Sequence, residues 1–189
     1  RVGNSAGVLL PKEWLKGKAK VELVEKPLNV KKDILDILYP YLEDIIGVYL
    51  VGSYARGEQT DRSDIDVLVI SKGTSKLIMK RKYEVVIAPL KSILSTLKEY
   101  PERVYPKFID ARAIINRGLL EELKRIDLTK NSFKNYFSDT KRIIKIDREF
   151  IELDKLEGSI LKSGTVVYSS LLRLRALYMI KCLLKKKKY

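Results

Sequence analysis

The sequence predicts a mixed α/β (α+β) fold, with a small mixed sheet and flanking helices. We expect a β-hairpin segment before the sheet and a helical domain after it. Between residues 28 and 126, short β-branched runs alternate with stretches of helical spacing. Before residue 28 there are β-like runs separated by glycine and proline, and beyond Asp127 no strand pattern occurs. We therefore expect three parts, which cover residues 1–27, 28–126 and 127–189.

The first part has the pattern of short strands joined by turns. The apolar run Val8–Leu10 is followed by Pro11, and a second β-like run occupies Lys20–Leu23. We expect a hairpin that either pairs with further strands or packs on the next domain.

The middle part begins with a helix. Apolar residues from Val30 to Ile46 follow helical spacing, Asn29 is available as the N-cap, and Pro40 should kink or split the helix. A polar loop should run from Gly52 to Ser63. The remaining elements that we expect are strands at Val48–Val51, Asp64–Ile70, Tyr83–Ala88 and Ala111–Ile115, and helices at Leu90–Leu97 and Leu119–Ile126.

The last part should be helical. Asn131 and Ser132 can cap a helix that carries apolar residues from Phe133 to Ile151. A final helix follows, with apolar residues at i, i+4, i+7 and i+11. These are Val167, Leu171, Leu174 and Tyr178. The single cysteine, Cys182, lies in an apolar stretch of that helix, which predicts a place in the core.

Composition excludes several classes of chemistry. The chain has no histidine, which rules out Ser-His-Asp and Cys-His triads, histidine bases and histidine-bound zinc. One cysteine cannot form an internal disulfide and suits a cytoplasmic protein. The longest apolar run is far shorter than the roughly 20 residues of a membrane span, so we expect no membrane partner.

Charge is unevenly distributed along the chain. The net charge is +14, yet the stretch from 28 to 70 has four basic and eight acidic residues. An acidic stretch between basic flanks suits a site that holds divalent cations together with phosphates, although general solubility explains a basic surface equally well.

Three carboxylates are the candidate metal ligands and catalytic groups. Asp64 and Asp66 should point from the same face of a strand, because side chains alternate with period two, while Ile65 points into the core. Two like charges this close repel unless a cation neutralises them. Glu84 would supply a third carboxylate if its strand lies beside the first, and three acids would hold two magnesium ions.

A glycine-rich bend before these acids is the candidate nucleotide-binding segment. Gly52 lets the backbone approach a phosphate, and Ser53 offers a hydroxyl and an amide. The guanidinium of Arg56 suits phosphate, although an arginine in a turn is often solvated surface.

The segment GSYARGEQTDRSDIDVLVI resembles the motif of DNA polymerase beta-like nucleotidyltransferases, especially the minimal ones. By this resemblance Gly52 and Ser53 contact the triphosphate, Asp64 and Asp66 bind the metals, and Glu84 lies beside the acceptor hydroxyl. The resemblance implies magnesium, an NTP donor that is ATP by family habit, and an acceptor that is RNA, a protein or a small molecule. It extends over about residues 28–126.

Two weaker resemblances leave alternatives open. The segment RVGNSAGVLLPKEWL looks like part of an AbrB or SpoVT-type domain, whose members dimerise and often bind DNA. The alternative function is therefore a dimeric DNA-binding regulator with a nucleotide-sensing, non-catalytic domain. The final helices are reminiscent of kanamycin nucleotidyltransferase, by which Arg173, Arg175 or Lys181 would reach phosphates, but an amphipathic helix explains these residues equally well.

Overall fold

The computed structural model describes residues 7, 9–20, 22, 28–156 and 164–187. The chain divides into two units, Arg1–Ile37 and Leu38–Tyr189, which are considered separately. The first unit contains a short 3-10 helix, η1 (Lys12–Trp14), and nearly all of α1 (Val30–Leu38).

The predicted N-terminal strands are wrong for the residues that the structure describes. Leu9, Leu10, Lys20 and Glu22 are outside any strand, and the other residues of the two predicted strands lie outside the described ranges. Pro11 instead leads into η1. Proline cannot donate to a strand ladder, and an isolated two-stranded hairpin is marginal in water.

The predicted helix from Val30 to Ile46 is split as expected near Pro40. The backbone amide of Lys32 donates to the Asn29 side chain at 3.2 Å, which is the predicted N-cap contact. A 3-10 helix, η2 (Tyr39–Asp44), has Pro40 near its start. Ile45 and Ile46 belong to the first strand and not to the helix, which corrects the prediction, because the apolar run continues directly into the sheet.

The second unit is built on a five-stranded mixed sheet with the order β3-β4-β2-β1-β5. Most strand pairs are antiparallel, whereas β2 and β4 are parallel. The strands are β1 (Ile45–Leu50), β2 (Ile65–Ser71), β3 (Lys76–Lys80), β4 (Tyr83–Pro89) and β5 (Arg112–Ile115). The predicted fold class is confirmed. The sequence prediction missed β3, a short edge strand whose Leu77 and Met79 are exposed.

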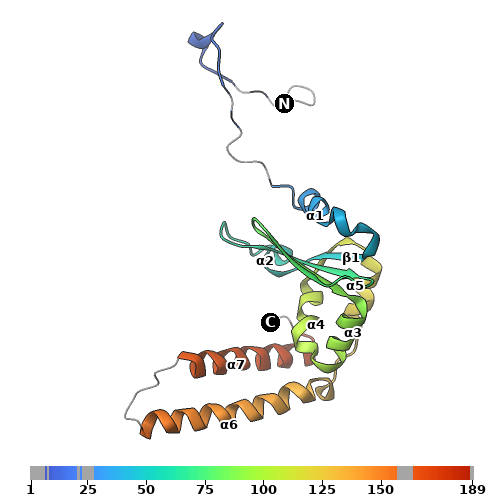
Figure 1. The fold of residues 1–189 in the computed structure, drawn as a ribbon, viewed down its shortest axis with the longest axis vertical. Coiled ribbons are helices and arrows are strands. Elements are labelled where there is room, and N and C mark those ends of the chain that lie inside the picture. The colour runs from blue at the N-terminus through green and yellow to red at the C-terminus, as the bar shows by residue number, and fades with distance from the viewer. Residues whose placement is uncertain (1–6, 8, 21, 23–27, 157–163, 188–189) are drawn as a thin grey trace. The chain divides into compact units, whose positions relative to one another are not determined.

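Three helices lie on one side of this sheet, as Figure 1 shows. They are α3 (Leu90–Glu99), α4 (Pro101–Asp110) and α5 (Arg117–Lys124). Together with the sheet they enclose a core that includes Tyr49, Leu68, Phe108 and Leu120. The prediction missed α4, because Pro106 lies inside it and proline normally disfavours a helix interior.

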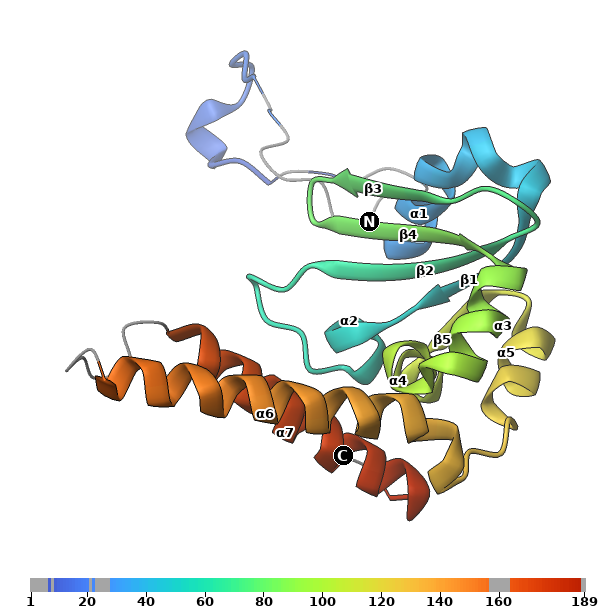
Figure 2. The same cartoon turned by 60° about the horizontal axis from the view of Figure 1, so that its bottom comes forward.

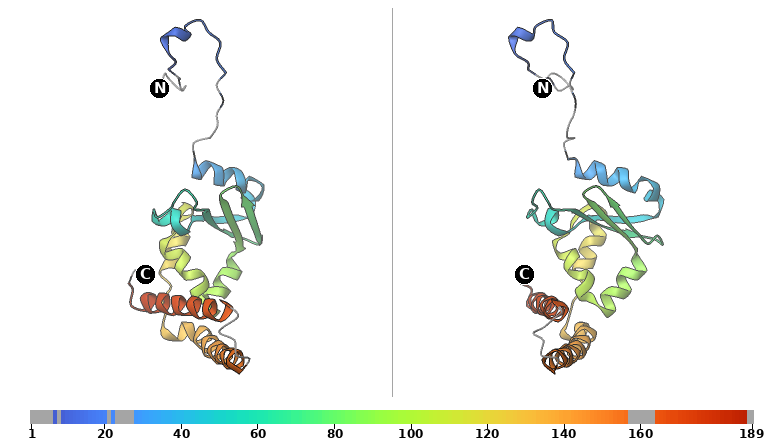
Figure 3. Two further views of the ribbon diagram at one scale, coloured as in Figure 1. Left: turned by 90° about the vertical axis from the view of Figure 1, so that its left-hand side faces the viewer. Right: turned by 60° about the vertical axis from the view of Figure 1, so that its left-hand side comes forward.

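Two long helices lie beyond α3, α4 and α5 and run side by side, as Figures 2 and 3 show. They are α6 (Lys134–Leu156) and α7 (Gly164–Leu184). A 3-10 turn, η3 (Lys130–Phe133), leads into α6 and is capped by Thr129 and Ser132. Cys182 is buried, as predicted, whereas the apolar stripe that begins at Val167 is largely exposed. No helix within the described ranges has both the length and the apolar content of a membrane span.

A tyrosine on β1, an inner strand of the sheet, links this strand to the start of α5. Tyr49 is completely buried, and its hydroxyl donates to the backbone carbonyl of Asn116 at 3.1 Å. A side chain at Gly47 would collide with the Tyr49 ring, so glycine leaves the room that the ring needs. Burial raises the pKa of Tyr49 to about 12.

Tyr49→Phe should lower the unfolding free energy at neutral pH. It should also make the unfolding free energy fall less steeply at high pH. The lost hydrogen bond costs about 1 kcal/mol at pH 7. Tyrosine in the unfolded chain ionises near pH 10, so the unfolding free energy of the wild type should fall between about pH 10 and 12. Urea titrations at pH 7 and from pH 9.5 to 11.5 measure both effects. Tyr39→Phe, an exposed tyrosine, is the control, and equal alkaline slopes in Tyr49→Phe and the wild type would contradict the prediction.

Candidate active site

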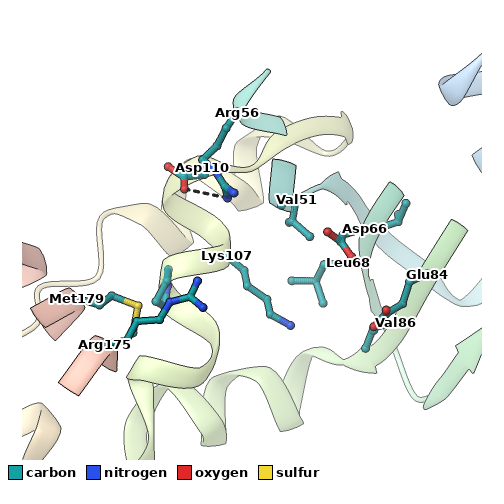
Figure 4. Close-up of a pocket in the computed structure, with 13 residues that line it drawn as sticks. Val51, Arg56, Asp66, Leu68, Glu84, Val86, Lys107, Asp110, Arg175 and Met179 are labelled. Atoms are coloured by element: carbon teal, nitrogen blue, oxygen red, sulfur yellow. Dashed lines mark ion pairs between the residues drawn. The ribbon is translucent and has the colours of Figure 1, made fainter. Parts of the chain in front are cut away.

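A pocket of about 300 Å³ lies between the sheet and the helices α4 and α7. Its walls come from both ends of α2 (Gly52–Arg56), from the strands β2 and β4, and from the helices α4 and α7. The helix α2 is short and lies where a loop was predicted. Figure 4 shows its side chains. The volume is at the lower end of the range of small-molecule sites.

Two of the three predicted acids meet in this pocket. Asp66 on β2 is directly paired with Glu84 on β4 in the parallel register, and both line the pocket. Asp64 comes just before β2, is exposed and does not line the pocket. Ile65 is completely buried, as expected for the residue between the two aspartates.

The position of the Asp66 carboxylate depends on Gly52. Gly52 has a φ of 67°, in the left-handed region, and a side chain there would collide with the Asp66 carboxylate. The amide of Val51 donates to the carbonyl of Asp66 at 2.9 Å, which fixes the bend against β2. The glycine is therefore needed both for the backbone conformation and for the position of the carboxylate.

The electrostatic environment of Asp66 is dominated by burial and negative neighbours. Burial raises the pKa of Asp66, and the charges of Glu84 and Asp64 raise it further, while Lys107 and Arg56 lower it. The ionised form of Asp66 is consequently disfavoured, and a bound cation would favour it.

Arg56 and Ser53, the other predicted nucleotide contacts, occupy different positions. Arg56 lines the pocket, but its Nε lies 2.7 Å from an oxygen of Glu58 and its Nη1 lies 3.7 Å from Oδ2 of Asp110. Figure 4 shows the second of these ion pairs. Ser53 does not line the pocket, and its carbonyl accepts the amide of Glu58 at the end of α2.

Two positive side chains face the acids from the helices. Lys107 on α4 and Arg175 on α7 line the pocket opposite β2 and β4, and Figure 4 shows Lys107 extending towards the acids. Lys107 and Asp110 were not among the predicted site residues, because α4 was not a predicted helix. The helical spacing of Val104, Tyr105 and Phe108, preceded by Pro101 as a helix-start residue, is the signal that could have found them.

The donor set fits a divalent cation. Carboxylate oxygens are the ligands that magnesium prefers, and the repulsion around Asp66 is what a cation would relieve. Among the described residues, however, no group of three or more acidic, histidine or cysteine side chains is close enough together to hold a metal ion. Asp66 and Glu84 therefore fit such an ion, whereas the full set with Asp64 stays a prediction.

Charges of opposite sign are separated across the pocket. The acids Asp66 and Glu84 come from the sheet, and the cations Lys107 and Arg175 come from the helices. A ligand with a metal ion on one side and several phosphates on the other would meet complementary charge on both sides.

Comparison with known proteins identifies a family and two relatives of this chain. A family model described as a nucleotidyltransferase domain matches residues 28–152. "Putative protein adenylyltransferase MJ1305" of Methanocaldococcus jannaschii is 34% identical over 121 residues, which are 60% of this chain and 80% of that protein. "Putative protein adenylyltransferase MJ0141" of the same organism is 36% identical over 81 residues, which are 37% of this chain and 79% of that protein.

A solved structure is also similar, at a lower level. It is that of a nucleotidyltransferase-like protein from Exiguobacterium sibiricum, with 16% identity and a TM-score of 0.44. The match covers 84% of this chain, but this chain spans only 58% of that one. The family match begins at residue 28, so the AbrB-like resemblance of the first residues has no counterpart in it.

Proposed function

The chain belongs to the nucleotidyltransferase domain family, and from this premise we propose that it transfers AMP from ATP to a hydroxyl group of a protein. Its enzyme class, nucleotidyltransferase, follows from the family. The adenylyl donor and the protein acceptor are supported by the names of the two relatives. The alternative acceptors are an RNA and a small molecule, and transfer of the label to either would contradict the protein acceptor.

The observation that carries this proposal is the pairing of Asp66 with Glu84 at the wall of a pocket whose other wall holds Lys107 and Arg175. Asp66 and Glu84, with Asp64, would hold two magnesium ions, which would neutralise the phosphate charge and favour in-line displacement. Lys107 and Arg175 would bind the β- and γ-phosphates. Gly52 and Ser53 would lie along the triphosphate, and Arg56 would orient Asp110.

The reaction exchanges one phosphorus–oxygen bond for another. The acceptor hydroxyl oxygen forms a bond to the α-phosphorus while the bond to the bridging oxygen of the β-phosphate breaks, and pyrophosphate leaves. Glu84, beside Asp66, would accept the hydroxyl proton. The segregated charges then keep the triphosphate in line with the attacking oxygen.

Incubation with labelled ATP tests the proposal directly. The protein, magnesium chloride and cell lysate are mixed with ATP labelled at the α- or the γ-phosphate. We expect the α-label, and not the γ-label, in a band that protease removes and ribonuclease leaves intact. A ribonuclease-sensitive band would contradict the protein acceptor, and absence of transfer from every NTP would contradict the enzymatic function.

Lys107→Met should weaken nucleotide binding more than turnover. The loss of one positive charge facing the phosphates should raise the KM for ATP about tenfold, with a smaller change in kcat. Steady-state kinetics of pyrophosphate release measure both parameters. Lys91→Met, which removes an exposed lysine of α3 outside the pocket, should leave them unchanged. An unaltered KM in Lys107→Met would contradict the assigned role.

A further inference from the structure

A second pocket contains two charged side chains with unsatisfied buried atoms. Within the described residues, the buried side-chain polar atoms without a hydrogen-bond partner are Oε2 of Glu102 and Nε of Arg173. Both residues line a pocket of about 370 Å³ between α4, α6 and α7. Two opposite charges left unsatisfied in one pocket are costly, and a pairing between them would remove both costs.

Glu102 is held in an environment that disfavours its charge. It is only 9% exposed, and its nearest cation is the exposed Arg103, at 4.0 Å from Oε1. Burial raises the pKa of Glu102, its own backbone amide and the charge of Arg103 lower it in part, and the charge of Asp139 adds to the rise. Among the described residues, the ion pair of Glu102 is therefore the long contact of Oε1 with Arg103, while Oε2 has no hydrogen-bond partner.

Arg173 is oriented towards the same pocket by contacts that leave Nε unused. Its Nη1 donates to Oγ1 of Thr140 at 3.1 Å, and its carbonyl accepts the Tyr136 hydroxyl at 3.3 Å. The guanidinium also lies 6.0 Å from the centre of the Tyr136 ring. These contacts anchor Arg173 to α6, while one donor stays available for a partner on α4.

The same two helices line the nucleotide pocket. Glu102 and Lys107 both belong to α4, and Arg173 and Arg175 both belong to α7. Residues two apart on a helix point in nearly opposite directions, so Arg173 faces one pocket while Arg175 faces the other. A contact that fixes Arg173 therefore also fixes the reach of Arg175.

We propose that Glu102 and Arg173 form an ion pair when nucleotide is bound, and that this pair draws α7 towards α4 and holds Arg175 on the phosphates. Both are positioning residues, and their role rests on the proposed function of the nucleotide pocket. The movement of α7 towards α4 would satisfy two buried groups that have no partner in the structure without nucleotide. Part of the affinity for nucleotide then comes from the second pocket.

The test is to measure thermal stability and nucleotide affinity of Glu102→Gln together. Removal of an unpaired buried carboxylate should raise the Tm of the nucleotide-free protein by about 2 °C. The same change should weaken binding of a fluorescent ATP analogue with magnesium roughly tenfold, because the closed form loses its ion pair. A higher Tm together with a lower affinity for the ATP analogue would show that Glu102 is a positioning residue. A purely structural role would lower both the Tm and the affinity.

Further variants connect the pair to Arg175. Arg173→Met should weaken binding as much as Glu102→Gln, Arg173→Lys should recover part of the affinity, and the double variant Glu102→Gln/Arg173→Met should be no weaker than either single change. In an Arg175→Met background, Glu102→Gln should have no further effect on affinity. Glu122→Gln on α5, an exposed glutamate, is the control for loss of a carboxylate.

The outcomes separate this proposal from the function on which it rests. Wild-type protein that binds no ATP analogue would overturn both. Binding by the wild type with unchanged affinity in Glu102→Gln, a lower Tm together with lower affinity, or an undiminished effect of Glu102→Gln in the Arg175→Met background would each overturn the ion pair alone.

Discussion

Asp66→Asn should abolish nucleotide transfer while the protein stays folded. Asp66 is a half-buried carboxylate of the pocket, and asparagine keeps its shape but cannot balance a divalent cation. We expect kcat to fall about a thousandfold, in the range of losses seen when one group that stabilises transition-state charge is removed. The loss is measured by release of pyrophosphate under saturating ATP.

Stability should change in the opposite direction. Because burial and the neighbouring acids raise the pKa of Asp66, its charge opposes folding in metal-free buffer, and its removal should raise the Tm. Asp61→Asn, in the exposed loop before β2, is the matched control and should leave activity and Tm unchanged. Wild-type activity in Asp66→Asn would refute the assignment of the site.

Gly52→Ala should be nearly as damaging, although it adds only a methyl group. The left-handed φ of 67° costs about 1–2 kcal/mol for a residue with a side chain. The new Cβ would also collide with the Asp66 carboxylate and push it out of the pocket. Displacement of a catalytic group by about 1 Å can cost a hundredfold in rate, so we expect a loss of at least that order.

Gly73→Ala provides the matched control for this change. A Cβ at Gly73 would meet nothing within 4 Å, and its φ is outside the left-handed region. Activity assays and thermal denaturation of the two variants should therefore differ in both rate and Tm. If Gly52→Ala retained wild-type turnover, the close approach of Gly52 to Asp66 could not matter for catalysis.

The strands of the site could be predicted because their signals are local. Alternation around Asp66 and the β-branched run that follows Glu84 mark β2 and β4, and both strands are found within one residue of their predicted bounds. Their adjacency was a condition of the prediction, since sequence spacing alone does not say which strands are neighbours. The parallel register supplies that adjacency.

The helical half of the site could not be predicted in the same way. Lys107 directly follows Pro106, and a proline at this place in the sequence argues against a helix. No helix was therefore predicted around Lys107. Its proximity to Asp66 depends on how α4 folds against the sheet, which involves contacts between residues about forty positions apart. Glu102 illustrates the same limit, because an acidic residue in the first turn of a helix normally reads as an exposed, dipole-stabilising group.

The N-terminal prediction was wrong for a different reason. Short apolar runs such as the one before Pro11 have the composition of strands, but composition does not supply a hydrogen-bonding partner. The short helix α2 was predicted as a loop, because its five residues are too few to show a helical period.

The two-residue turn at Arg81 and Lys82, which joins β3 to β4, restricts how this gene can tolerate insertions and deletions. Side chains alternate between the faces of a strand, so a shift of β4 by one residue would carry Glu84 to the opposite face of the sheet. A shift by two residues would keep the face and move the carboxylate along the strand. Length changes near this turn should therefore survive selection mainly when the register of β4 beside β2 is left intact.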